Sequence, residues 1–286
     1  MPTGVNAMAL AYRPDVAAEA GVEIPMEMTW SQFLDASKTV YEKTGWKSLW
    51  ASECSSTGVE HSLRNNGLEF FNEDGSALGF DDPSYIVNVW QRALDAIDAG
   101  YANDVDEIAV SGSDCFVENT WVYALWTNAF GAYETDSGCE LQMMNLVAED
   151  NAIAPANWLK PTLYWAATAG SDVEDLAVEF INFFVNDTDV YDIVGTDRGI
   201  PIDADVKAYM DGKLEGASAK TNAFIAYLGE GDRTGSLVMD LSPAAAEVRE
   251  LLNEYTQQVL YRVATDLEQT ATDFINEAND ILAAAG

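Results

Sequence analysis

Histidine and basic side chains are scarce in this 286-residue chain. It has one histidine, His61, and 14 lysine and arginine residues against 48 aspartate and glutamate residues, a formal net charge of −34. This balance argues against a nucleic-acid or anionic-membrane partner, because phosphate contacts need a basic patch. The single histidine excludes histidine-rich metal sites, and a Ser-His-Asp mechanism would have to use His61.

Cysteines, cofactor motifs and long apolar runs are also few or missing. The three cysteines, Cys54, Cys115 and Cys139, cannot all pair within one chain. Cys115 and Cys139 could form a disulfide in an exported protein, but all three as small buried side chains is the favoured interpretation. No apolar run reaches the roughly 20 residues of a membrane span. Without a P-loop, a dinucleotide fingerprint or an H-E-x-x-H motif, no cofactor is expected.

The residues that are present predict strands separated by amphipathic helices. Hydrophobic residues make up 48% of the chain, enough for a sizeable core. Thr29 and Gln32 form a capping box, and Gly45 ends the helix that they begin. The pattern predicts strands at 46–52 and 121–127, a polar turn at 52–58, and helices at 29–42, 82–99, 172–186, 206–210, 243–259 and 265–282. Strands alternating with helices of this length indicate an α/β layer architecture.

The segment from Leu163 to Asp203 is the most informative part of the sequence. It begins as a short β-prone run and ends at Gly-Ile-Pro, residues 199–201. Between them, Ser171 and Glu174 read as a capping box. The helix predicted there carries an apolar face, the Phe-rich face, made of Leu176, Phe180, Phe183 and Phe184.

Four sequence motifs carry a resemblance to a known family. They are PTGVN at 2–6 followed by AYRPD at 11–15, TWSQF at 29–33, residues 116–133, and the strand–helix–GIP order described above. In this order and spacing, the chain resembles the extracellular solute-binding proteins of ABC importers, in the carbohydrate-binding branch called family 1. It departs from that pattern at Arg13 and Pro14, where Asn-Lys is commoner, and at 118–120, where a Gly-Lys pair is usual.

The resemblance implies a periplasmic-binding-protein-like (type II) fold with two lobes. Residues 1–157 and 206–286 would form a complete second lobe, and 158–205 would hold the hinge crossings and a remnant of the first lobe. Thr3, Gly4 and Pro201 would be hinge residues. Nothing near the first residue looks like a signal peptide, so signal and anchor are expected in a longer, extracellular or periplasmic lipoprotein form. The Phe-rich face would then lack cover, which predicts self-association.

The resemblance also implies a carbohydrate ligand, bound between the lobes without catalysis and delivered to the transmembrane subunits of a permease. Flat aromatic rings suit the weakly apolar face of a sugar, and amide or carboxylate groups suit its hydroxyl groups. Ligand sites favour strand ends in α/β sheets, and the family places an aromatic residue where Trp126 stands. The expected ligand-binding residues, near three strand ends, are Trp126, Asn128, Glu53, Trp50, Tyr164 and Trp158. A tryptophan on a strand is also a common core residue.

Two alternative functions remain open from the sequence. The first keeps a binding protein but changes its ligand to a polyamine, a peptide or a glycerol-phosphate-type solute. The second is a glycoside hydrolase, which needs paired carboxylates, with Glu53 and Glu118 as the candidates. No catalytic motif supports the hydrolase.

Overall fold

The computed structural model describes residues 1–48, 55–105, 107, 114–196, 198–237 and 241–285. The predicted ligand residues Trp50 and Glu53 lie outside these ranges, as does Cys54. The strands are β1 (Val5–Asn6), β2 (Met8–Tyr12), β3 (Lys47–Ser48), β4 (Thr120–Trp126), β5 (Gln142–Met144) and β6 (Lys160–Pro161).

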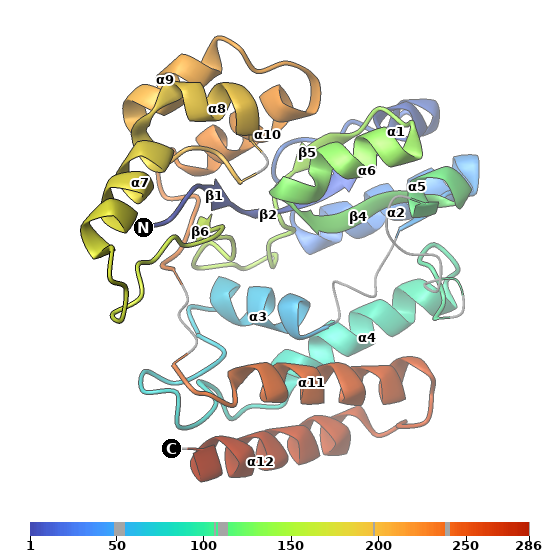
Figure 1. Ribbon diagram of the computed structural model, residues 1–286. Helices are drawn as coiled ribbons and strands as arrows, with labels where there is room; N and C mark the ends of the chain where they lie inside the picture. Colours follow the sequence, from blue (N-terminus) through green and yellow to red (C-terminus); the bar gives the residue numbers. More distant parts are fainter. Residues whose placement is uncertain (49–54, 106, 108–113, 197, 238–240, 286) are drawn as a thin grey trace.

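Helices make up most of the remaining regular structure (Figure 1). They are α1 (Pro14–Ala20), α2 (Trp30–Thr44), α3 (Ser56–Asn65), α4 (Ser84–Asp98), α5 (Cys115–Glu118), α6 (Phe130–Ser137), α7 (Glu174–Asn186), α8 (Thr188–Val194), α9 (Ala204–Asp211), α10 (Gly216–Leu228), α11 (Ala245–Leu260) and α12 (Leu267–Ala285), with a 3₁₀ turn at Thr127–Ala129.

Two small sheets share one stretch of chain. The four-stranded sheet has the order β3-β4-β2-β5, with β2 antiparallel to β4 and β5 and with β3 parallel to β4. Just before β2, separated only by Ala7, β1 pairs with β6, and Val5 also bridges to Ile200. The segments around β1, β6 and Ile200 are called the crossing segments below. They meet beside the first residue of β2 and the last residue of β4, since Met8 lies opposite Trp126.

The central strand β2 separates two hydrophobic cores, because successive side chains of a strand point to opposite faces. Met8 and Leu10 pack into the larger core with α2, α3, α4, α11 and α12. The alanines at 7, 9 and 11 face the other way, into a core that includes Phe130 of α6 and Phe224 of α10. Small side chains on this face let those helices approach the sheet closely.

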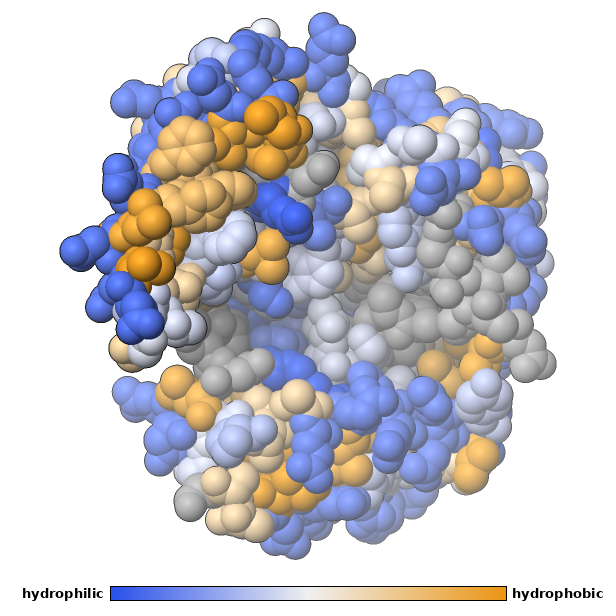
Figure 2. All heavy atoms as spheres, in the orientation of Figure 1, coloured by the Kyte–Doolittle hydropathy of each residue, from blue (hydrophilic) through white to orange (hydrophobic). Residues whose placement is uncertain are grey.

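Helices α7, α8 and α9 gather beside β1 and β6, away from the large core (Figure 1). Val190 and Tyr191 of α8 pack against Val206 and Met210 of α9 in a third, small cluster. The Phe-rich face of α7 is open to solvent as expected: Leu176 is 62% exposed, and Phe180 and Phe183 are each 48% exposed. Figure 2 shows apolar residues on this side of the molecule. The lobe boundaries near 157 and 206 stay predictions.

Several predicted elements agree with the structure. The Thr29–Gln32 capping box is present, with the Thr29 N–H donating to Gln32 Oε1 at 2.9 Å, and Gly45 ends α2 in the left-handed conformation. The aromatic strand at 121–127 is β4, and the short helix near 206–210 is α9. Cys115 and Cys139 are free thiols, with Cys115 buried.

Other predicted boundaries are wrong in detail. The 52–58 turn overlaps α3, which begins at Ser56. Ser171 does not cap α7 through a capping box: Val173 is the N-cap residue, and the Ser171 hydroxyl accepts from the Val173 N–H. The Gly- and Ser-containing stretch after α9 contains a 13-residue helix, α10, that the pattern did not predict.

Candidate functional site

Two tryptophans meet where β4 ends. Trp126, the last residue of β4, is partly buried, and its ring centroid lies 6.1 Å from that of Trp158 in an edge-to-face arrangement. Lys160 of β6 places its Nζ 4.7 Å from the centre of the Trp126 ring, and Arg64 of α3 lies 4.9 Å from the centre of the Trp158 ring. These four residues, with His61, are called the Trp126 cluster below.

The backbone around Trp158 is fixed by one buried amide. Asn157 is 2% exposed, and its Nδ2 donates to the Met8 carbonyl at 2.8 Å and to Asn145 Oδ1 at 2.9 Å. Its Oδ1 accepts from the Trp158 N–H at 2.9 Å. The pairing of β5 with β2 ends at Leu10, so β5 provides no backbone donor for the Met8 carbonyl. The Asn157 side chain provides that donor instead. Trp158 is thereby tied to the central strand.

Arg64 holds the cluster from the side of α3. Its side chain is 3% exposed; Nε donates to the Ala156 carbonyl at 2.9 Å and Nη2 to the Ser236 carbonyl at 2.7 Å. Nη1 lies 3.0 Å from Glu69 Oε2, a carboxylate that is half exposed. The guanidinium therefore joins α3, the segment before Trp158 and the chain near Ser236 in one polar network.

His61 is the buried end of the cluster. Its ring lies 5.8 Å from that of Trp158, and burial together with the nearby Arg64 charge lowers the His61 pKa to about 3. The imidazole is thus neutral at ordinary pH. Its Nε2 is buried and has no hydrogen-bond partner in the part of the chain that the structure describes. A neutral, enclosed imidazole adds no charge to the cluster.

The predicted hinge residues lie together at the crossing of three segments. Thr3 Oγ1 contacts Thr162 Oγ1 at 3.0 Å, and the Tyr191 hydroxyl donates to the Thr3 carbonyl at 3.2 Å. Gly4 packs so tightly that an added Cβ would lie 2.5 Å from the Arg198 carbonyl oxygen. Pro201 is buried one residue after the strand bridge at Ile200. The hinge role of Thr3, Gly4 and Pro201 stays a prediction.

The other predicted ligand residues lie near this crossing but outside the Trp126 cluster. Asn128 is exposed and lines a cavity of about 200 Å³ with, among others, Asn6, Thr196 and Gly199. Tyr164 is 62% exposed, and its backbone bridges to Pro2. Figure 2 shows that the surface is hollowed between the part formed by α7–α9 and the part formed by the lower helices.

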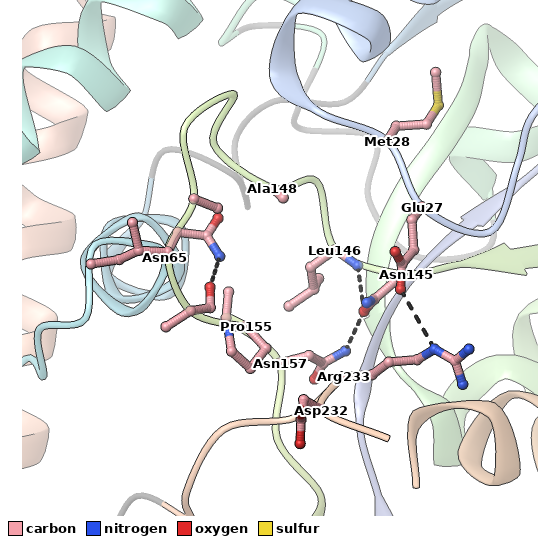
Figure 3. A pocket seen from close by; sticks show the side chains of 14 residues that line it. Glu27, Met28, Asn65, Asn145, Leu146, Ala148, Pro155, Asn157, Asp232 and Arg233 are labelled. Atoms are coloured by element: carbon pink, nitrogen blue, oxygen red, sulfur yellow. Dashed lines mark hydrogen bonds and ion pairs between the residues drawn. The ribbon is translucent and has the colours of Figure 1, made fainter. Parts of the chain in front are cut away.

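A larger cavity of about 420 Å³ lies beside α3 (Figure 3). Asn65, Asn145 and Asn157 line it, but their amide groups serve the protein itself. Asn65 donates to the Ala154 carbonyl and accepts from the Glu149 N–H, and Asn145 Oδ1 accepts from Asn157 and from the Leu146 N–H. The side-chain oxygens of these asparagines already accept hydrogen bonds from the protein. The Trp126 cluster is therefore the better candidate for a ligand site.

Sequence reasoning missed three members of the cluster. Arg64, Lys160 and His61 belong to no motif, and only the uniqueness of His61 in the chain drew attention to it. His61 and Arg64 are one helical turn apart on α3, but Lys160 follows 96 residues later, and no local pattern links it to them. Among the described residues, no group of three or more His, Cys, Asp or Glu side chains could hold a metal ion.

The comparisons with known proteins identify the family and the fold. The family model for bacterial extracellular solute-binding proteins matches residues 1–215, and the chain belongs to this family. It is similar to an arabinooligosaccharide-binding protein from Halalkalibacterium halodurans, with 30% identity over 112 residues. That match covers 39% of this chain and only 24% of the relative's length.

Solved structures show the same fold. A family 1 extracellular solute-binding protein from Alicyclobacillus acidocaldarius superposes with a TM-score of 0.84 at 21% identity, covering 99% of this chain and 72% of that one. A periplasmic oligogalacturonide-binding protein from Yersinia enterocolitica, in complex with saturated digalacturonic acid, gives 0.80 at 17%, covering 100% and 72%. The predicted two-lobe α/β solute-binding fold is confirmed. In the described part of the chain, no helix is both long and apolar enough to cross a bilayer.

Proposed function

We propose that this protein is the substrate-binding component of an ABC importer and binds a mono- or oligosaccharide without altering it. The observation that carries the proposal is Trp126: its indole lies partly exposed at a strand end, beside a second tryptophan and next to the crossing segments. A sugar ring would stack in this region, with Asn128, Tyr164, Trp158, Trp50 and Glu53 as the further contacts. The similarity to an arabinooligosaccharide-binding protein supports a saccharide ligand.

In this proposal the ligand is enclosed by a hinge movement between two lobes. Residues 1–157 and 206–286 form one lobe, and 158–205 hold the crossings and part of the other. Thr3, Gly4 and Pro201 lie at the crossings, where small backbone rotations move one lobe against the other. The closed form is presented to the permease at the outer face of the membrane, where a lipid anchor would hold it.

The size of the aromatic contribution follows from contact area. One sugar-on-indole contact buries about 100 Å² of apolar surface, which at about 25 cal/mol/Å² contributes ~2.5 kcal/mol. Two such contacts with several hydrogen bonds give micromolar binding, near −8 kcal/mol, once ordering costs are subtracted. Trp126 offers one of those rings, and the exposed Tyr164 is the candidate for the other. Trp158 is only 7% exposed, so its contribution is to pack edge-to-face against Trp126.

The geometry favours binding over hydrolysis. Glu118 precedes β4 and Trp126 ends it, so seven strand residues, on the order of 20 Å, separate the two. A retaining glycosidase needs two carboxyl groups roughly 5 Å apart, and an inverting one needs roughly 6.5–9.5 Å. Glu118 therefore cannot supply a carboxylate beside Trp126. The cationic Lys160 and Arg64 also disfavour a polyamine ligand.

Isothermal titration with a panel of mono- and oligosaccharides tests the proposal. For the best ligand, Trp126→Ala should weaken binding about 60-fold, the equivalent of the ~2.5 kcal/mol contact. Trp46→Ala is a matched control, because the Arg13 guanidinium lies 4.7 Å from the centre of the Trp46 ring. Trp46 precedes β3, whose Lys47 pairs with Thr120 at the start of β4, whereas Trp126 is the last residue of β4. Equal losses in both variants, or no saccharide bound at all, would contradict the proposal.

A further inference from the structure

Most cations of this chain are paired with carboxylates. Nine of the 14 lysine and arginine side chains have a carboxylate oxygen within 4.0 Å: Arg13, Lys47, Arg64, Arg92, Lys213, Lys220, Arg233, Arg249 and Arg262. With 48 acidic residues available, pairing is the expected state. The other five have no carboxylate within that distance among the described residues: Lys38, Lys43, Lys160, Arg198 and Lys207. Of these five, Lys160 and Arg198 belong to the crossing segments.

These two cations lie on neighbouring parts of the crossing. Lys160 is exposed, and its recorded contact is with the Trp126 ring. Thr162, two residues later and on the same side of the extended chain, donates its hydroxyl to the Arg198 carbonyl at 2.6 Å. Arg198 is exposed as well. Lys160 thus lies over the ring proposed to carry the sugar, and the Arg198 backbone is tied to the chain two residues after Lys160.

We propose that Lys160, with Arg198 as a second cation, selects sugars that carry a carboxylate, that is, uronic acids. This inference rests on the proposed function and specifies its ligand class. Lys160 lies over a face of the Trp126 indole that a stacking sugar ring would use. An incoming carboxylate gives the ammonium group a new partner, so Lys160 leaves the ring and the sugar stacks in its place.

Relative strengths decide between acidic and neutral ligands. An exposed cation–π contact is worth a factor of about three in an equilibrium constant, whereas a charge-assisted hydrogen bond is worth a factor of about ten or more. A uronic acid therefore binds more tightly overall, because the hydrogen bond that its carboxylate gains with Lys160 is stronger than the cation–π contact that is lost. A neutral sugar must displace Lys160 without supplying a comparable partner, and its affinity is reduced by the lost contact.

The net charge of −34 does not overrule this local selection. Charges separated by more than about 8 Å are largely screened at 0.15 M salt, so the dispersed acids act mainly on the approach of an anion. At contact distance the Lys160 ammonium group over the Trp126 ring dominates. The overall charge should slow association of a uronate ligand and leave the preference for its carboxylate in place.

The test compares two disaccharides that differ only in their carboxyl groups. Isothermal titration of the 286-residue chain with α-1,4-digalacturonate and with α-1,4-galactobiose should show at least tenfold tighter binding of the acid. Lys160→Met should bring the ratio of the two affinities close to one, Arg198→Gln should lower it less, and Lys160→Arg should largely retain it. Lys38→Met, on exposed α2 surface, is the matched control. Circular dichroism verifies folding of each variant.

Each result separates the two proposals. Galactobiose binding as tightly as digalacturonate would overturn the uronate inference and leave saccharide binding intact. An affinity ratio unchanged in both Lys160→Met and Arg198→Gln would also overturn it. Succinate, a dicarboxylate without a sugar, should bind far more weakly than digalacturonate. If succinate binds equally well, the carboxylate alone is recognised and the saccharide function itself fails.

Discussion

Replacing Asn157 by alanine should be among the most destabilising single changes near the site. The Asn157 amide makes three hydrogen bonds, to the Met8 carbonyl, to Asn145 Oδ1 and from the Trp158 N–H. Alanine removes all three. Asn145 Oδ1 keeps its bond from the Leu146 N–H, so two buried backbone groups lose the partner that Asn157 provided.

The magnitude follows from those two groups. A buried donor or acceptor left without a partner costs about 1–3 kcal/mol. For the Met8 carbonyl and the Trp158 N–H together, we expect a loss of about 4 kcal/mol in the free energy of unfolding. This is a large fraction of the roughly 5–15 kcal/mol of a typical protein. At roughly 2–4 °C per kcal/mol for a chain of this size, the melting temperature should fall by about 10 °C.

Urea unfolding followed by tryptophan fluorescence measures the loss. Asn186→Ala is the matched control, because the Asn186 amide donates only to Asn182 Oδ1 on the exposed surface of α7. That control should change the free energy of unfolding by less than about 0.5 kcal/mol. A cost below about 1 kcal/mol for Asn157→Ala would refute the reasoning that this amide replaces a missing strand partner.

Three further predictions concern pH, the crossing and the exposed helix. Because the His61 pKa falls from 6.5 to about 3 on folding, the unfolded chain binds a proton that the native chain does not, and stability is lost as pH falls through this window. Between pH 7.5 and 5, the free energy of unfolding of the unsubstituted protein should fall by about 2 kcal/mol more than that of His61→Gln. A difference in unfolding free energy between the two proteins that does not change with pH would contradict this. Gly4→Ala should cost about 1–3 kcal/mol in urea unfolding, since its Cβ would meet the Arg198 carbonyl oxygen at 2.5 Å, whereas Gly170→Ala, with nothing within 4 Å, should be neutral. Phe180→Glu should reduce self-association through the Phe-rich face in sedimentation velocity, and unchanged association would show that this face is not the contact.

Elements with local signals were predictable from sequence. Helix α2 carries its own start and stop, in the Thr29–Gln32 capping box and Gly45, and both act within one turn of the helix. The β-prone aromatic run at 121–127 is β4 almost residue for residue. Trp126 was predicted as a site residue because it ends this strand and because the family resemblance implies a ligand-binding aromatic residue at that position.

Elements without such signals were not predictable. Helix α10 is rich in small and mixed residues, so its apolar positions form no clear stripe, and it is helical because it packs against α6 and β5. Helix α3 begins with Ser56, Thr57 and Gly58, residues typical of a turn, and this made its start look like a polar turn. The rest of the helix is buried although it carries Glu60, His61 and Arg64. Their burial is tolerated because Arg64 and Glu60 have partners distant in sequence.

The amino-acid sequence by itself determined the family, the α/β class and the strand that ends in Trp126, because capping, periodicity and motif spacing are short-range properties. Only the tertiary structure decided what surrounds that ring. Trp158 and Lys160 reach it because β1 and β6 pair across some 150 residues of chain, and Arg64 reaches Trp158 from a third segment. Side-chain neighbours of this kind depend on how distant segments pack, and nothing in a local pattern encodes their distance.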